Sequence, residues 1–287
     1  MPTSPLAYAF QPHEKIKVGF ARVLGEISVR GQGLTRRSRE PTGESIHEGR
    51  LLIKRVRALL WFARPALGVA AYARARARLR RAAGVLAGQR DLAVTQATLE
   101  QLARNASKAR DRAALAQIFQ SLVRHSAAGE APEKALRQLL QKAMGILCQS
   151  VDEIQRSAAG RAAWPSPSAR LAKAFRATRQ AGKKARRTGK DADFHEWRKK
   201  AKRLLYQLEL TQAGSGRRMA RTTKRVAKLQ DKLGATHDGV VVEDRLRQML
   251  PVPSSARRVL RLLEKRKARL RRRTWEIARG IESKGWA

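Results

Sequence analysis

Long segments of the chain repeat apolar residues every three or four positions, the spacing of one face of an α-helix. The first runs from about Pro12 to the glycines at 31 and 33, and the second from about Gly43 to Arg64, where Pro65 predicts its end. Further helices are predicted at about 68–86, 92–104, 107–127, 132–157, 194–214, 217–228 and 254–281. Another helix is predicted to begin at 168, and one more to end at about 250. The pattern predicts an all-α fold.

Short segments rich in Gly, Pro or Ser separate the predicted helices, and the clearest linker is residues 164–168. We therefore predict a first helical half at residues 12–160 and a second at 166–285. Asp91 and Ser168 are candidate N-caps. Asp191 and Asp193 are expected just before a helix.

The two predicted halves share an internal repeat. Adding 148 to the numbers of His47, Arg50, Lys54 and Arg55 gives His195, Arg198, Lys202 and Arg203. Adding 147 to Arg74, Arg78, Arg81, Leu86, Arg90 and Asp91 gives Arg221, Arg225, Lys228, Leu233, His237 and Asp238. We expect two helical bundles related by a pseudo-twofold axis, each presenting its His helix and the following basic helix to a shared surface.

A stripe of basic residues follows from the spacing in the first copy. His47, Arg50, Lys54 and Arg57 are separated by three or four residues, so they lie on one face of a helix. At about 1.5 Å per residue the stripe is about 15 Å long. This shape suits an extended polyanion better than a point ligand.

Charge supports the same interpretation. The 287 residues carry 63 Lys and Arg against 23 Asp and Glu, a net charge of +40 that a bound polyanion would relieve. Counting by halves gives 28 − 12 = +16 for residues 1–163 and 35 − 11 = +24 for residues 164–287. A basic partner is excluded by this charge.

Cys148 is the single cysteine, which excludes an intrachain disulfide and agrees with a reducing cytoplasm. No apolar stretch approaches the roughly 20 residues of a membrane span, and no signal-peptide pattern opens the chain. We expect a cytoplasmic protein.

The paired His-x-x-Arg-x-x-x-Lys-Arg helices, followed by a turn of the Leu-Gly-x-x-His-Asp type at 233–238, resemble the CHAD family, the conserved histidine α-helical domain. The resemblance covers about residues 12–285. It implies two helical bundles around a central basic cavity that binds inorganic polyphosphate, in some members with targeting to polyphosphate or polyhydroxyalkanoate granules. Gly49 departs from the family pattern, since a helix-favouring residue is usual there, and predicts a looser first half.

The candidate polyphosphate-binding residues combine the resemblance with the basic helices. They are His47, Arg50, Lys54, Arg55, Arg57, Arg74, Arg78, Arg81, Arg90, Arg176, Arg179, Lys183, His195, Arg198, Lys199, Lys202, Arg203, Arg221, Lys224, Arg225, Lys228 and His237. Arg offers a planar fork to phosphate oxygens and Lys a mobile charge. For the two repeated histidines, phosphate contact is favoured over structural hydrogen bonding and metal ligation.

Alternatives remain for the less specific features. The basic run 265–273 is interpreted equally well as a solvated or nonspecific polyanion-binding face or as a segment with a specific role, and the aromatic residues of the His helices are expected in the core. A nonspecific nucleic-acid-binding protein is the rival function. No paired carboxylates and no nucleophile with a plausible base occur, so we expect neither an enzyme nor a cofactor.

Overall fold

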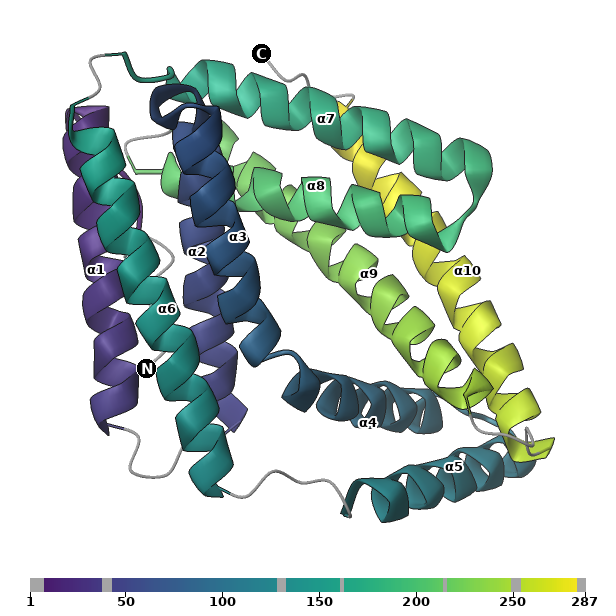
Figure 1. Cartoon of the computed structure of the whole chain (residues 1–287). Coiled ribbons are helices and arrows are strands. Elements are labelled where there is room, and N and C mark those ends of the chain that lie inside the picture. The colour runs from purple at the N-terminus through teal and green to yellow at the C-terminus, as the bar shows by residue number, and fades with distance from the viewer. Residues whose placement is uncertain are drawn as a thin grey trace. The chain divides into compact units, whose positions relative to one another are not determined.

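The computed structural model describes residues 8–37, 43–127, 133–160, 163–213, 216–248 and 254–282. Within these ranges the chain forms ten α-helices and no strand, which confirms the predicted all-α class (Figure 1). The helices are α1 (Ile16–Arg37), α2 (Gly43–Leu67), α3 (Val69–Val85), α4 (Gly88–Arg104), α5 (Ala109–Ala127), α6 (Glu133–Ala159), α7 (Pro167–Thr188), α8 (Asp191–Leu210), α9 (Arg217–Arg247) and α10 (Ser254–Glu282). Within the described part of the chain, none of them is long and apolar enough to cross a membrane.

The chain divides into two compact units that interleave along the sequence. Unit 1 comprises Met1–Gly88, Ala131–Thr178 and Lys202–Lys224. Unit 2 comprises Gln89–Glu130, Arg179–Ala201 and Arg225–Ala287. Helices α7, α8 and α9 therefore contribute to both units. The contiguous halves 12–160 and 166–285, and their pseudo-twofold relation, stay predictions.

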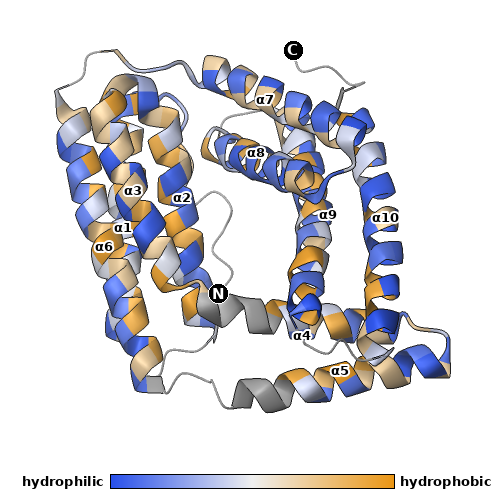
Figure 2. Ribbon diagram, turned by 45° about the vertical axis from the view of Figure 1, so that its right-hand side comes forward, coloured by the Kyte–Doolittle hydropathy of each residue, from blue (hydrophilic) through white to orange (hydrophobic). Residues whose placement is uncertain are grey.

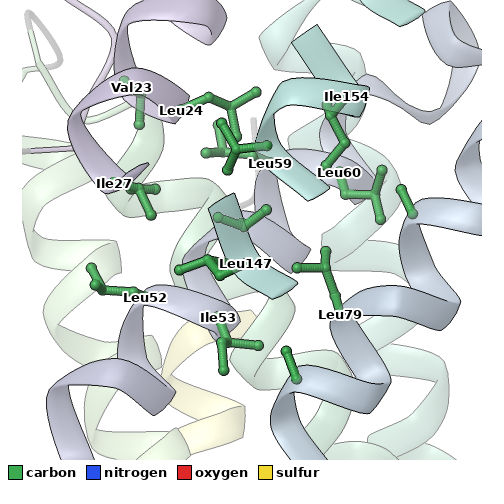
Figure 3. Close-up of a cluster of buried hydrophobic side chains, with 14 of the residues drawn as sticks. Val23, Leu24, Ile27, Leu52, Ile53, Leu59, Leu60, Leu79, Leu147 and Ile154 are labelled. Carbon is green, nitrogen blue, oxygen red and sulfur yellow. The ribbon is translucent and has the colours of Figure 1, made fainter. Parts of the chain in front are cut away.

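Unit 1 is built around the bundle of α1, α2, α3 and α6 (Figure 1). Figure 3 shows its core, to which Leu24 of α1, Ile53 of α2, Leu79 of α3 and Leu147 of α6 contribute side chains that are at most 1% exposed. Removal of these side chains from water is the main force that holds the bundle together.

Glycines let α6 approach its neighbours closely. A Cβ atom on Gly49 of α2 would lie 3.1 Å from Leu140 and 3.2 Å from Met144, and one on Gly31 of α1 would lie 3.5 Å from Met144 and Leu147. The prediction that α1 stops near Gly31 and Gly33 is therefore wrong, because this packing outweighs low helix propensity. The expectation that Gly49 loosens the first half is wrong for the same reason.

The predicted end of α2 at Pro65 is also wrong, since the helix continues to Leu67. Proline has no N–H, so the carbonyl of Trp61, four residues earlier, loses its helical donor. The Nη2 atom of Arg170 in α7 donates a hydrogen bond to that carbonyl. An arginine from another helix thus satisfies the group that the proline leaves unpaired.

The predicted turn at 233–238 is instead part of α9, which is one continuous helix. Leu233 and Thr236 are buried, and the Thr236 hydroxyl donates to the Lys232 carbonyl, 2.8 Å away. Buried contacts here outweigh the preference of Gly234 for a turn.

The observed helix bounds correct two cap assignments and the position of one acidic pair. Asp91 lies inside α4, which begins at Gly88, so it is not the N-cap residue. Ser168 lies in the first turn of α7, whose first residue is Pro167. The acidic pair Asp191 and Asp193 lies in the first turn of α8 rather than before it, where negative charge favours a helix start.

Two of the apolar contacts within the described part of unit 2 hold α10 to its neighbours. Leu115 and Ile118 of α5 share one buried cluster with Val259 and Leu263 of α10. Trp197 of α8 stacks on Trp275 of α10 with ring centroids 4.5 Å apart. Hydrophilic residues dominate much of the remaining α10 surface (Figure 2).

A buried ion-pair network joins α8, α9 and α10 within unit 2. Lys267 of α10, with 3% of its side chain exposed, pairs with Glu243 of α9, with Glu264 at 2.6 Å and with Asp191 of α8 at 3.5 Å. Arg271 also pairs with Asp191, at 2.5 Å. The basic run 265–273 is therefore not one solvated face, because two of its members are structural.

The pKa of the Glu243 carboxyl is lowered by this network. Burial acts to raise it, and hydrogen bonds from Lys267 and Arg247 outweigh that effect. A carboxyl whose folded pKa is lowered stabilises the fold above its ordinary pKa, and the contribution is lost as the pH falls through the folded value.

We expect Gly49→Leu to destabilise the protein by about 1–3 kcal/mol, because the added atoms meet Leu140 and Met144 of α6. Urea unfolding followed by circular dichroism measures the change. Gly145→Ala is the control, since a Cβ on Gly145 meets no atom within 4 Å. It should raise stability by about 0.5–1 kcal/mol. Equal effects of the two substitutions would contradict the close packing.

Lys267→Met should destabilise the protein by about 3 kcal/mol at pH 7, because it leaves Glu243 buried with fewer cationic partners. The deficit should shrink below about pH 4.3, the usual pKa of a Glu carboxyl, where the wild type also loses the network. Arg272→Met, at an exposed position of the same run, should change stability by less than about 0.5 kcal/mol. A deficit that does not change with pH would refute the electrostatic origin.

Candidate anion-binding site

The stripe of α2 extends beyond its predicted end. Arg50, Arg57 and Arg64 are spaced by seven residues along the helix, so they lie on one face, and α2 remains helical through all three. Arg50 donates from Nη1 to the carbonyl of Leu86, whereas the side chains of Arg57 and Arg64 are exposed. His47, at the start of the stripe, is exposed as well.

Arg55 lies on a different face of α2 and has a different environment. Its guanidinium sits 4.1 Å from the centroid of the Tyr8 ring, and Arg55, Tyr206 and Glu209 line a small pocket. Burial raises the pKa of the Glu209 carboxyl, and the charges of Arg55 and Lys202 oppose that rise. Two predicted site residues, Arg55 and Lys202, therefore face a carboxyl group of the same unit.

Arginines lie on two faces of α3, and their neighbours on the two faces carry charges of opposite sign. On one face, Arg74 and Arg78 pair with Glu153 of α6 at 3.3 and 3.2 Å. These are the arginines that the repeat selected. Their charge is partly neutralised by the protein itself, which makes them less available to a ligand.

On the other face, the positive charges of Arg76 and Arg80 are close enough to affect the pKa of Arg57 in α2. Although part of the Arg57 side chain is exposed, neighbouring groups partly shield its guanidinium from water, and this burial, followed by the positive charges of Arg76 and Arg80, lowers its pKa. These three guanidinium groups therefore repel one another. An anion bound among them would relieve that repulsion.

Arg170 brings a further cation to the same part of unit 1. The residue is 5% exposed, and its guanidinium lies 3.7 Å from the centroid of the Trp61 ring while donating to the Trp61 carbonyl. Burial, followed by the charges of Arg203 and Arg64, lowers its pKa to about 10. Arg203 lies 5.0 Å from the Trp61 centroid and Arg64 lies 5.1 Å from that of Tyr72.

Tyr72 links the two groups of arginines, because its phenol group, when ionised, raises the pKa of both Arg57 and Arg170 and so opposes their neighbours. We name the set the Tyr72 arginine cluster, which comprises Arg57, Arg64, Arg76, Arg80, Arg170 and Arg203. All six belong to unit 1. The sequence predicted Arg57 and Arg203 and missed the other four.

There are identifiable reasons why the sequence did not predict these arginines. Adding 147 to the positions of Arg76 and Arg80 gives Thr223 and Ala227, so the repeat pointed away from them. Arg64 lay at the predicted end of its helix. The available signals were the seven-residue spacing of Arg64 from Arg57 and the four-residue spacing of Arg76 from Arg80.

Unit 2 brings together two of the predicted histidines. The Nδ1 atoms of His195 in α8 and His237 in α9 are 3.3 Å apart. The pKa of the His195 imidazole is lowered, first by burial and then by the charges of Lys199 and Arg198. Among the residues described, no three His, Cys, Asp or Glu side chains gather in a way that could hold a metal ion.

The remaining predicted residues lie mainly at helix surfaces. The side chains of Arg81, Arg176, Arg179, Lys183, Lys199, Arg221, Lys224 and Lys228 are exposed, and those of Lys54 and Arg198 are half-buried. Lys199 pairs with Glu196 at 2.6 Å, and Arg225 donates to the carbonyl of Gly280. The side chain of Arg90 lies outside the described residues. The predicted cavity shared by both halves stays a prediction.

Trp61, Phe62 and Trp197 are buried, which confirms their predicted place in the core. A comparison with curated proteins gave no match. The family model of the CHAD domain matches residues 21–247, which is most of the chain and includes both His helices. The chain therefore belongs to the CHAD family.

Proposed function

We propose that this protein binds inorganic polyphosphate without hydrolysing or transferring it. The Tyr72 arginine cluster is the observation that carries the proposal, because Arg57 and Arg170 each lie among other arginines whose positive charges lower their pKa. Membership of the CHAD family is consistent with polyphosphate binding in general. Binding of long chains would place the protein at polyphosphate granules in the cytoplasm.

The ligand chemistry follows from the residue types. A polyphosphate chain offers a row of anionic oxygens, and each guanidinium can donate two parallel hydrogen bonds to such oxygens. The α2 stripe from Arg50 to Arg64 covers 14 residues, which at about 1.5 Å per residue gives about 21 Å along the helix. An extended, repeating anion can contact that whole length, whereas a single phosphate cannot.

The aromatic residues favour polyphosphate over single-stranded nucleic acid. Proteins that bind single strands stack bases on accessible aromatic rings. Trp61 is 6% exposed and carries arginines on its ring, and Trp197 is 2% exposed and stacks on Trp275. These rings are occupied by protein groups, so the site offers charge with little provision for bases.

We expect long-chain polyphosphate to compete better than duplex DNA or RNA for the protein. The measurement is displacement of labelled polyphosphate at physiological salt, with competitors matched in phosphate concentration. Affinity for polyphosphate should fall steeply as salt rises, because bound counterions are released. Displacement by nucleic acid at equal phosphate concentration would leave only nonspecific charge attraction.

Replacing Arg57, Arg76 and Arg80 together by Gln should weaken polyphosphate binding and lower the slope of log affinity against log salt by about 2–3. The control replaces Arg269, Arg272 and Arg273, which are exposed on α10 and carry the same total charge. Its slope should change by less than about one. Equal losses in the two triple variants, at equal thermal stability, would refute the assignment of the site to the cluster.

A further inference from the structure

Arg170 is a buried residue with a positively charged side chain. Its side chain packs on Trp61, one terminal nitrogen donates to the Trp61 carbonyl, and within the described part of the chain the buried Nε atom has no hydrogen-bond partner. Removing a guanidinium from water is costly unless an opposite charge compensates it. Besides burial, the like charges of Arg203 and Arg64 lower the pKa of Arg170, and Tyr72 opposes them.

The two neighbouring arginines reach the surface. Arg64 is exposed and Arg203 is half-buried, and each guanidinium lies over an aromatic ring that restricts its position. A ligand can therefore contact Arg64 and Arg203 directly, while the buried Arg170 adds the attraction of a third positive charge. Such attraction is strong where water is excluded.

A polyphosphate chain presents two kinds of phosphate to such a group of cations. An internal phosphate carries a single negative charge. A terminal phosphate has a second ionisation, with a pKa of about 6 in phosphate esters, and carries close to two charges at neutral pH. It also offers three free oxygens, which makes it the better partner for three converging guanidinium groups.

We propose that Arg64, Arg170 and Arg203 form a seat for the terminal phosphate of a polyphosphate chain. The remainder of the chain then follows the α2 stripe through Arg57 toward Arg50. Trp61 and Tyr72 hold the guanidinium groups in place by stacking, and the hydrogen bond from Arg170 to the Trp61 carbonyl ties α7 to α2. This inference rests on the proposed function, and it specifies which part of the ligand is recognised.

Chain-end recognition is tested with linear polyphosphate of one defined length, prepared with free ends or with both ends blocked as monoesters that lack the second ionisation. Isothermal titration calorimetry at pH 7.5 gives both affinities. The wild type should bind the free-ended chain about ten-fold or more tightly than the blocked chain, since charged hydrogen bonds are lost on blocking. Equal affinities would overturn the chain-end seat and leave the proposed function intact. Absence of binding to either form would overturn the proposed function itself.

A matched pair of double variants locates the seat. Arg64→Gln with Arg203→Gln should abolish the preference for free ends, and it leaves Arg170 in place because that residue supports α2 at Pro65. Arg257→Gln with Arg261→Gln removes the same charge at exposed positions of α10, outside the candidate binding residues, and should keep the preference. Thermal unfolding verifies that both variants are folded. A preference that survives in the first variant, or that is lost in both, would refute the assignment to Arg64 and Arg203.

Discussion

The placement of a small number of carboxylates is the constraint on which this structure depends. A net charge of +40 in 287 residues opposes the packing of helices, because every close approach brings cations together. Glu153 faces two arginines of α3, and Glu243 with Asp191 surrounds Lys267. These carboxylates lie at helix contacts, where each one offsets repulsion that would otherwise separate two helices.

The same placement defines where positive charge is left for a ligand. Arg74 and Arg78 are paired with Glu153, and Arg55 with Lys202 faces Glu209, so these residues are partly occupied by the fold. In the Tyr72 arginine cluster the charges that lower the pKa of Arg57 and Arg170 are those of other arginines, and Tyr72 opposes that shift. Counting basic residues along a helix cannot distinguish arginines that face a carboxylate of the protein from arginines that face other arginines. The distinction requires knowing which carboxylate from a distant segment approaches which face.

The sequence predicted the helices well where apolar periodicity was long, and it failed where a distant segment changes a local preference. Gly31 and Pro65 normally interrupt helices, yet α6 packs on the first and Arg170 supplies the donor missing at the second. For the site, the repeat identified the His helices but selected Arg74 and Arg78, because their spacing recurs in the second half. Arg170 could not be found this way, since its role depends on a proline more than 100 residues earlier.

The two repeated histidines occupy different environments despite their matching positions. His47 is exposed on α2, whereas the Nδ1 atom of His195 lies 3.3 Å from the Nδ1 atom of His237. Subtracting 147 from His237 gives Arg90, so the first half has a permanent cation where the second has a titratable ring. Burial and the charges of Lys199 and Arg198 lower the pKa of the His195 imidazole, which favours its neutral form. Matching positions in the repeat therefore do not give the two histidines the same surroundings.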